Sequence, residues 1–320
     1  MSDVQAFAEK VIANVEKVIL GKRDVVELSV INLLCPGHLL IEDVPGVGKT
    51  MLARSLARSS GLSLNRIQFT PDMLPSDVTG VSIFNQGTRE FEFRAGPIMA
   101  QIVLADEINR ATPKTQAALL EAMQEGQITV DGVTHPLPKP FMVMATQNPI
   151  EYEGTFPLPE AQLDRFLMRV RIGYPNIADE IRVLEEQQFQ HPLEELEEVT
   201  SNKEVQAAQE AVKGVHMADA LKRYIVELSQ RTRSHPDVYL GASARGSLAL
   251  YRASQAQAAI VGREYVTPDD IKNLAQACLA HRIILGPTAR LQDVSAEDVV
   301  EGILEDVAVP GGDLRLEKSE

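Results

Sequence analysis

The sequence contains a glycine-rich turn that ends in a lysine and a threonine: Asp43-Val44-Pro45-Gly46-Val47-Gly48-Lys49-Thr50. The turn follows a continuously apolar run at residues 38–42, typical of a central parallel strand, and precedes a helical segment at 49–59. Its glycines let the backbone form a nest of N–H groups. These groups and the N-terminus of the following helix both attract phosphate oxygens. Lys49 would add a positive charge for the β- and γ-phosphates, and Thr50 a hydroxyl for Mg²⁺. The turn and the next residue, Met51, therefore predict a phosphate loop, although Asp43 replaces the first glycine of the strict pattern.

Other apolar segments place this loop in an α/β sheet. Buried strands are predicted at residues 102–105 and 141–145, and strands that alternate with helices indicate a parallel sheet. Two hairpins are predicted at 81–93 and 127–134, around Asn85-Gln86-Gly87 and Asp131-Gly132. Helices are expected at about 3–20, 25–34, 112–124, 178–190, 203–213, 217–233, 243–258, 267–281 and 295–305. We therefore expect a nucleotide-binding α/β core with two inserted hairpins at residues 1–175, followed by a helical lid domain at 176–320.

Two acids end the second buried strand. In open α/β sheets ligands bind at the carboxyl ends of strands, so Asp106 and Glu107 should face the bound nucleotide. Asp106 would hold Mg²⁺, and Glu107 would orient and deprotonate an attacking water. Asn148 ends the third strand and could bind both the γ-phosphate and this water, although an ordinary Asn-Pro turn is an alternative.

Two arginines are candidates for stabilising charge in the transition state. Arg165 lies in Leu163-Asp164-Arg165-Phe166 and would reach the nucleotide of a neighbouring subunit in a ring. The alternative is a salt bridge from Arg165 to Asp164 or Glu160. Arg245 follows Ser243, a candidate helix cap, and would face back to the nucleotide, or else it is a helix-surface arginine.

The order of these motifs resembles that of AAA+ ATPases, and the detail resembles the MoxR family over about residues 10–310. The segments that carry the resemblance are Glu42 to Thr50, Leu74-Pro75-Ser76-Asp77-Val78-Thr79-Gly80, Ala105-Asp106-Glu107-Ile108-Asn109-Arg110-Ala111, Leu119 to Gly126, Ala145-Thr146-Gln147-Asn148-Pro149 and Val266-Thr267-Pro268-Asp269-Asp270. Asp43 matches a familiar form of this family's loop, whereas Ala244 stands where the family usually has proline.

The resemblance implies an ATP- and Mg²⁺-dependent homo-oligomeric ring, often a hexamer, with nucleotide at the subunit interfaces. It implies a chaperone that acts on complexes containing von Willebrand factor A domains, or that helps to insert metal cofactors. The two hairpins resemble insertions that face the ring pore. By the same analogy Ile19, within Val18-Ile19-Leu20-Gly21, would line the adenine pocket.

Composition bounds the other possibilities. The formal net charge of −14 argues against a nucleic-acid-remodelling motor, which usually has a basic surface. A nucleotide-switched scaffold that does not hydrolyse ATP is a further alternative, against which Glu107, Asn148 and Arg165 all argue. Two distant cysteines, Cys35 and Cys278, do not suggest a disulfide framework, and the sequence has neither a signal peptide nor an apolar run long enough for membrane insertion. We therefore expect a cytoplasmic protein.

Overall fold

The computed structural model describes residues 1–149, 154–186 and 191–310. Its core is a five-stranded sheet in the order β2-β5-β8-β1-β9, in which all pairs are parallel. The strands are β1 (Leu39–Glu42), β2 (Leu64–Gln68), β5 (Ile102–Asp106), β8 (Met142–Gln147) and β9 (Met168–Val170). Glu42 lies opposite Gln147, and Gln68 opposite Asp106, so the carboxyl ends of these strands form one edge of the sheet.

The three predicted strands are confirmed as β1, β5 and β8, whereas β2 and β9 were not predicted. β2 is an edge strand in which only Ile67 is buried, so it lacks the continuous apolar run of a central strand. β9 is the other edge strand and has only three residues, which is too short to show a period.

Helices cover both faces of the sheet, which explains the continuous apolarity of its central strands. Leu39, Ile41 and Met144 point into one cluster, with α1 (Ser2–Val15), α2 (Arg23–Leu34) and α3 (Lys49–Ser59). Leu40 and Val143 point to the opposite face, against α5 (Pro113–Glu125). Short helices α4 (Pro75–Thr79), η1 (Ile108–Arg110) and α6 (Glu160–Leu163) lie in the connections between these elements.

The first predicted helix, 3–20, was too long. α1 ends at Val15, and the chain turns directly after it. Ile19, in this turn, is buried. This turn brings Ile19 against the phosphate loop, as described below.

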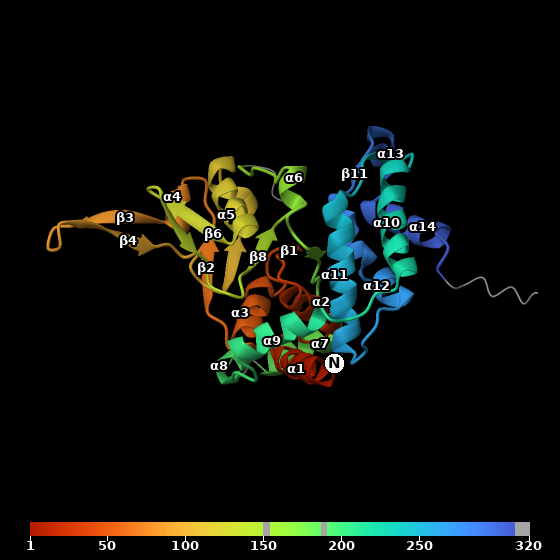
Figure 1. Ribbon diagram of the computed structural model, residues 1–320, viewed down its shortest axis with the longest axis horizontal. Coiled ribbons are helices and arrows are strands. Elements are labelled where there is room, and N and C mark those ends of the chain that lie inside the picture. The colour runs from red at the N-terminus through yellow and green to blue at the C-terminus, as the bar shows by residue number, and fades with distance from the viewer. Residues whose placement is uncertain (150–153, 187–190, 311–320) are drawn as a thin grey trace, which may run out of the picture.

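Both predicted hairpins are confirmed. β3 (Gly80–Asn85) pairs with β4 (Glu90–Ala95), and β6 (Gln127–Val130) pairs with β7 (Val133–Pro136), each antiparallel. The β3–β4 hairpin projects away from the sheet as a long arm, on the left in Figure 1.

The lid helices gather on the opposite side of the sheet from this arm (Figure 1). They are α10 (Asp219–Ser234), α11 (Ala244–Ile260), α12 (Pro268–Leu279), α13 (Pro287–Leu291) and α14 (Ala296–Asp306), with η2 (Ala280–Arg282) and a small sheet of β10 (Val238–Leu240) and β11 (Ile284–Leu285). In the sequence, α7 (Ile177–Glu186), α8 (Pro192–Glu195) and α9 (Asn202–Val212) lie between core and lid, and in the structure α9 packs against α1 and α2. Residues 187–190 of the predicted helix 178–190, and residues 311–320 of the predicted lid, lie outside the described residues. Within the described ranges, none of the helices combines the length and apolarity needed to cross a bilayer.

Candidate active site

The phosphate loop has the backbone that its glycines predict. Gly46 and Gly48 have φ angles of +87° and +95°, a region that side chains with a Cβ rarely adopt, and α3 starts at Lys49. Asp43 has a structural role in place of the expected glycine. Its Oδ1 accepts a hydrogen bond from its neighbour Val44 N (2.8 Å), and its Oδ2 accepts one from Gly173 N (2.6 Å), just after β9. The carboxylate therefore ties the base of the loop to the edge strand of the sheet.

Lys49 lies between two strand ends. Its Nζ donates to the carbonyl oxygens of Asp43 (2.5 Å) and Gln147 (3.4 Å), which follow β1 and end β8. Thr50 and Met51 occupy the first turn of α3 and are half-buried. A Cβ placed on Gly48 would lie 4.0 Å from Ile19 Cδ1, so Ile19 borders the loop from outside the α/β motif.

The two predicted acids are held in place by residues on both neighbouring strands. Asp106 Oδ1 accepts a hydrogen bond from Thr146 Oγ1 (2.6 Å) on β8, and its Oδ2 accepts one from Arg66 Nη2 (2.7 Å) on β2. Glu107 Oε2 accepts bonds from Gln68 Nε2 (2.7 Å) and Arg110 Nη1 (2.9 Å).

Glu107 also has an unusual backbone. Its φ of 56° lies in the left-handed region, which costs a residue with a Cβ roughly 1 kcal/mol and is typical of functional positions. Its N–H donates to Thr146 Oγ1 (2.9 Å), the same hydroxyl that donates to Asp106. One threonine hydroxyl thus contacts the side chain of Asp106 and the backbone of Glu107.

Asn148 follows Gln147 at the same edge and is buried. Asn109 Nδ2 donates to the Asn148 carbonyl (3.4 Å), which links the end of β8 to η1. The structure therefore brings together four predicted site residues from three separate parts of the chain: Lys49, Asp106, Glu107 and Asn148.

Asp106 and Thr50 suit the predicted magnesium ion. Carboxylate and hydroxyl oxygens are hard ligands, and Mg²⁺ typically takes one or two protein oxygens and fills its other positions with phosphate oxygens and water. Asp106 is nearly buried, and the hydrogen bonds from Arg66 and Thr146 fix the direction of its carboxylate. These two residues could hold the ion together with a bound nucleotide.

The two predicted arginines lie elsewhere. Arg165 and Arg245 line one cavity together with Arg252 and with residues 36–38, which precede β1. Since the phosphate loop follows the carboxyl end of β1, the arginines lie at the opposite edge of the sheet. The expectation that Arg245 faces back to the nucleotide of its own chain is therefore wrong: α11 packs so that Arg245 lies beside Arg165.

The alternative interpretation of Arg165, a salt bridge to Asp164 or Glu160, is not seen among the described residues. Asp164 Oδ1 instead accepts a hydrogen bond from Arg282 Nε (2.9 Å), and its Oδ2 accepts one from Ser243 Oγ (2.8 Å). Ser243 caps α11 as predicted, since its Oγ accepts a hydrogen bond from Arg245 N (3.0 Å). Arg165 Nε is buried and has no hydrogen-bond partner in the described part of the chain.

Arg282 anchors this cluster. Its side chain is 3% exposed, and it donates to the carbonyl oxygens of Phe166 (2.5 Å) and Leu167 (3.3 Å) as well as to Asp164. Burial lowers the pKa of its guanidinium, while Asp164 opposes that shift. The segment that carries Arg165 is thus fixed by a buried charge from the lid.

His38 closes the same cavity from the core. Its Nδ1 accepts a hydrogen bond from Val143 N (3.0 Å), so its Nε2 carries the proton and donates to the Met123 carbonyl (3.0 Å). Burial lowers the pKa of His38 to about 4, and the ring is therefore neutral at pH 7.

Sequence reasoning missed the residues that support the acids and arginines, namely Arg66, Gln68, Thr146 and Arg282. Arg66 and Gln68 lie on the unpredicted strand β2, and Arg282 is 118 positions from Asp164, its partner in the fold. Thr146 was visible as a polar residue at the end of a buried strand, two positions before Asn148.

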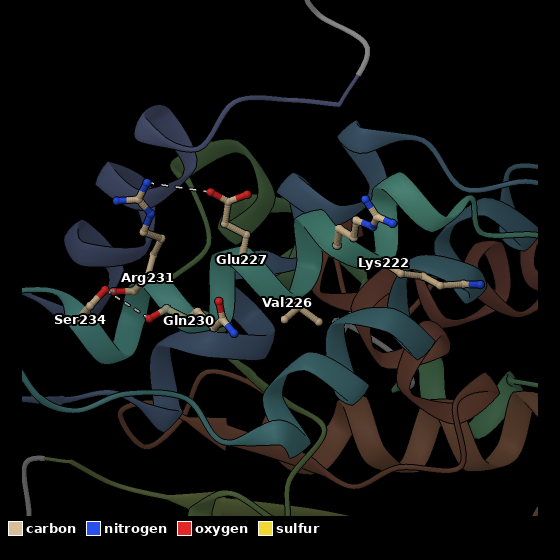
Figure 2. A pocket seen from close by; sticks show the side chains of 7 residues that line it. Lys222, Val226, Glu227, Gln230, Arg231 and Ser234 are labelled. Atoms are coloured by element: carbon tan, nitrogen blue, oxygen red, sulfur yellow. Dashed lines mark hydrogen bonds and ion pairs between the residues drawn. The ribbon is translucent and has the colours of Figure 1, made fainter.

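A second hollow runs along the outer face of α10 (Figure 2). Its lining comes from one helix, on which Arg231 pairs with Glu227 one turn earlier (3.9 Å). Its lining residues include none of the predicted site residues, and it has the character of a charged helix face in water.

Known proteins resemble this chain in both sequence and structure. Residues 38–168 match the model of the ATPase family associated with various cellular activities (AAA), and residues 230–303 match that of the AAA lid domain. The uncharacterized protein YeaC of Bacillus subtilis is 56% identical, covering 96% of each chain. The chaperone MoxR1 of Mycobacterium tuberculosis is 40% identical over 94% of this chain and 82% of its own length. A crystal structure from Cytophaga hutchinsonii has a TM-score of 0.90 at 38% identity and covers 96% of this chain and 97% of its own. On these matches, which span the α/β core and the lid alike, the chain belongs to the MoxR family of AAA+ ATPases.

Proposed function

We propose that this chain hydrolyses ATP with Mg²⁺ at a site shared by adjacent copies in a homo-oligomeric ring, a hexamer, and uses the energy to remodel partner proteins. One observation carries the proposal. The loop and acids that would bind and attack the nucleotide lie at one edge of the sheet, whereas Arg165 and Arg245 lie at the other. A single chain therefore cannot apply these arginines to its own nucleotide, but a neighbour in a head-to-tail ring can.

The chemistry assigned to the site is attack of water on the γ-phosphorus, with cleavage of the bond to the bridging oxygen and release of ADP and phosphate. Glu107 accepts a proton of the attacking water, and Asn148 orients that water. Lys49 contacts the phosphates. When bound, Mg²⁺ neutralises charge on the phosphate oxygens and is held by Thr50 and Asp106.

The arginines would act from the neighbouring copy. Arg165 is the better placed of the two for the γ-phosphate, since its Nε is buried and has no partner within the described residues. Arg245 is half-exposed and 3.9 Å from Asp164, so it is free to reorient towards an anion. Guanidinium groups that approach a transferring phosphate in this way contribute about 10³- to 10⁵-fold in rate in related systems.

The chaperone role rests on the family. MoxR1 of Mycobacterium tuberculosis is named a chaperone, and we extend that activity to this chain. We further propose that its clients are complexes with von Willebrand factor A domains or proteins that receive a metal cofactor. Cys35 and Cys278 are free, buried thiols, which supports a cytoplasmic location.

The test is the Mg²⁺-dependent ATPase rate per subunit as a function of protein concentration. The rate should rise with concentration, and the inactive variants Arg165→Ala and Glu107→Gln should partly rescue each other when mixed. Each variant then supplies the half of the site that the other lacks. A rate that is independent of concentration where monomers dominate, with no rescue, would contradict the shared site.

The same preparation separates the two alternative functions. Normal ATP binding without turnover would indicate a nucleotide-switched scaffold. Binding of DNA with an affinity that falls steeply as the salt concentration rises would indicate a nucleic-acid motor.

A further inference from the structure

Helix α7 presents its apolar side to solvent. Ile177, Ile181 and Leu184 are 81%, 51% and 71% exposed, and their spacing places them on one face of the helix. The side that faces the protein carries Asp179 and Val183, which are half-buried. A helix on the surface of a monomer normally has the reverse arrangement. We call Ile177, Ile181 and Leu184 the α7 stripe.

The segment that leads into α7 contacts the base of the phosphate loop. Gly173 N, four residues before α7, donates to Asp43 at the base of the loop, and Lys22 Nζ donates to the Tyr174 carbonyl (2.8 Å). Asp179 lies so close to Gly21 that a Cβ on this glycine would clash with its carboxylate. Helix α7, with its solvent-facing stripe, therefore lies on the nucleotide-binding side of the chain.

The arginine cavity has complementary chemistry. Arg165, Arg245 and Arg252 line it beside Leu248, an apolar residue that is 46% exposed. Among the described residues that line it, Asp164 is the single carboxylate, and it is already bound by the buried Arg282. We call this surface the arginine face. In contrast, α7 carries four acidic residues and one arginine.

We propose that the α7 stripe packs against the arginine face of a neighbouring copy of this chain and forms the apolar centre of the ring interface. The inference rests on the proposed shared site, in which the arginine side of one copy meets the phosphate-loop side of the next. A contact between unlike faces is heterologous and closes into a ring when the rotation allows. Stable interfaces bury about 800 Å² per partner, so polar residues around the stripe and Leu248 complete the contact.

The experiment is sedimentation velocity of the full-length chain with Mg²⁺ and a non-hydrolysable ATP analogue. Ile181→Asp damages the α7 stripe alone, and Leu248→Asp damages the arginine face alone. Leu184→Asp repeats the first change at a more exposed position, and circular dichroism verifies the fold of each variant. Val261→Asp is the matched control, since Val261 is also 46% exposed but lies at the far end of α11.

We expect the wild type and Val261→Asp to form rings, and Ile181→Asp and Leu248→Asp each to sediment as monomers. An equimolar mixture of these two variants should form a heterodimer, because one intact α7 stripe meets one intact arginine face. If Leu248→Asp forms dimers while Ile181→Asp is monomeric, the stripes pack against each other and the proposed pairing is overturned. It is also overturned if Ile181→Asp and Leu184→Asp assemble as the wild type does. The α7 stripe would then be a surface that binds a client protein.

Assembly and turnover are measured separately, so the two proposals can fail separately. Wild-type rings that hydrolyse no ATP, but that dissociate with Ile181→Asp, would support the interface and contradict the proposed function. A chain that is monomeric at every concentration but hydrolyses ATP would overturn both the shared site and the interface.

Discussion

Replacing Asp164 with alanine should destabilise the protein by about 3 kcal/mol. The change removes the hydrogen bonds from Arg282 Nε (2.9 Å) and Ser243 Oγ (2.8 Å). Both are bonds to a charged carboxylate, and a hydrogen bond to a charged group contributes about 1.5–3 kcal/mol, so the loss is at least about 3 kcal/mol. The substitution would also leave the Arg282 guanidinium buried without its carboxylate partner. Because backbone carbonyl oxygens still accept hydrogen bonds from Arg282, we expect the loss of stability to lie at the lower end of the range for a broken buried ion pair.

Urea unfolding followed by circular dichroism would measure this loss. With a slope of about 3 kcal/mol per M, the midpoint should fall by about 1 M. The control is Glu160→Ala, four residues earlier on the exposed surface, which should change stability by less than about 0.5 kcal/mol. A loss below about 1 kcal/mol for Asp164→Ala would show that the carbonyl contacts of Arg282 suffice, and that Asp164 does not fix the arginine face.

Three further outcomes follow from the structure. The stability of the wild type should fall by about 3 kcal/mol relative to His38→Gln as the pH drops from about 6.5 towards 4. In this range the unfolded chain binds a proton at His38, whereas the folded chain, in which His38 has a pKa of about 4, does not. Parallel pH profiles of stability for the two proteins would refute this. Arg169→Ala should cost about 2 kcal/mol in urea unfolding, since the Arg169 side chain is 15% exposed and bridges Glu42 (3.0 Å) and Glu297 (2.7 Å). Arg171→Ala should cost under about 1 kcal/mol, because the Arg171 side chain is 58% exposed. Equal losses for the two variants would contradict the role of burial. Lys49→Ala should weaken ATP binding at least about 10-fold in calorimetry, as expected for loss of one charge-assisted phosphate contact, and unchanged affinity would contradict the phosphate-loop assignment.

The local parts of the fold and site could be predicted from the sequence. The phosphate loop, the Asp106-Glu107 pair and Asn148 each lie at the end of a buried strand, and their patterns are complete within about ten residues. Parallel strands bring their carboxyl ends to one edge, so three local patterns were sufficient to predict one site. The hairpins were equally legible, because their turns and their alternation are local.

Tertiary structure alone decided what depends on packing between distant segments. The edge strands β2 and β9 have no pattern of their own and exist because central strands offer unpaired backbone groups. The arginines could be listed from the sequence but not placed, since the cap at Ser243 does not say which edge of the sheet α11 approaches. Three separate segments bring together Asp164, Arg282 and Ser243. The apolar face of α7 could be recognised as exposed only from the structure, in which the hydrophobic core forms without it. Periodicity shows that a helix has an apolar side, but only the folded chain shows whether that side is already covered.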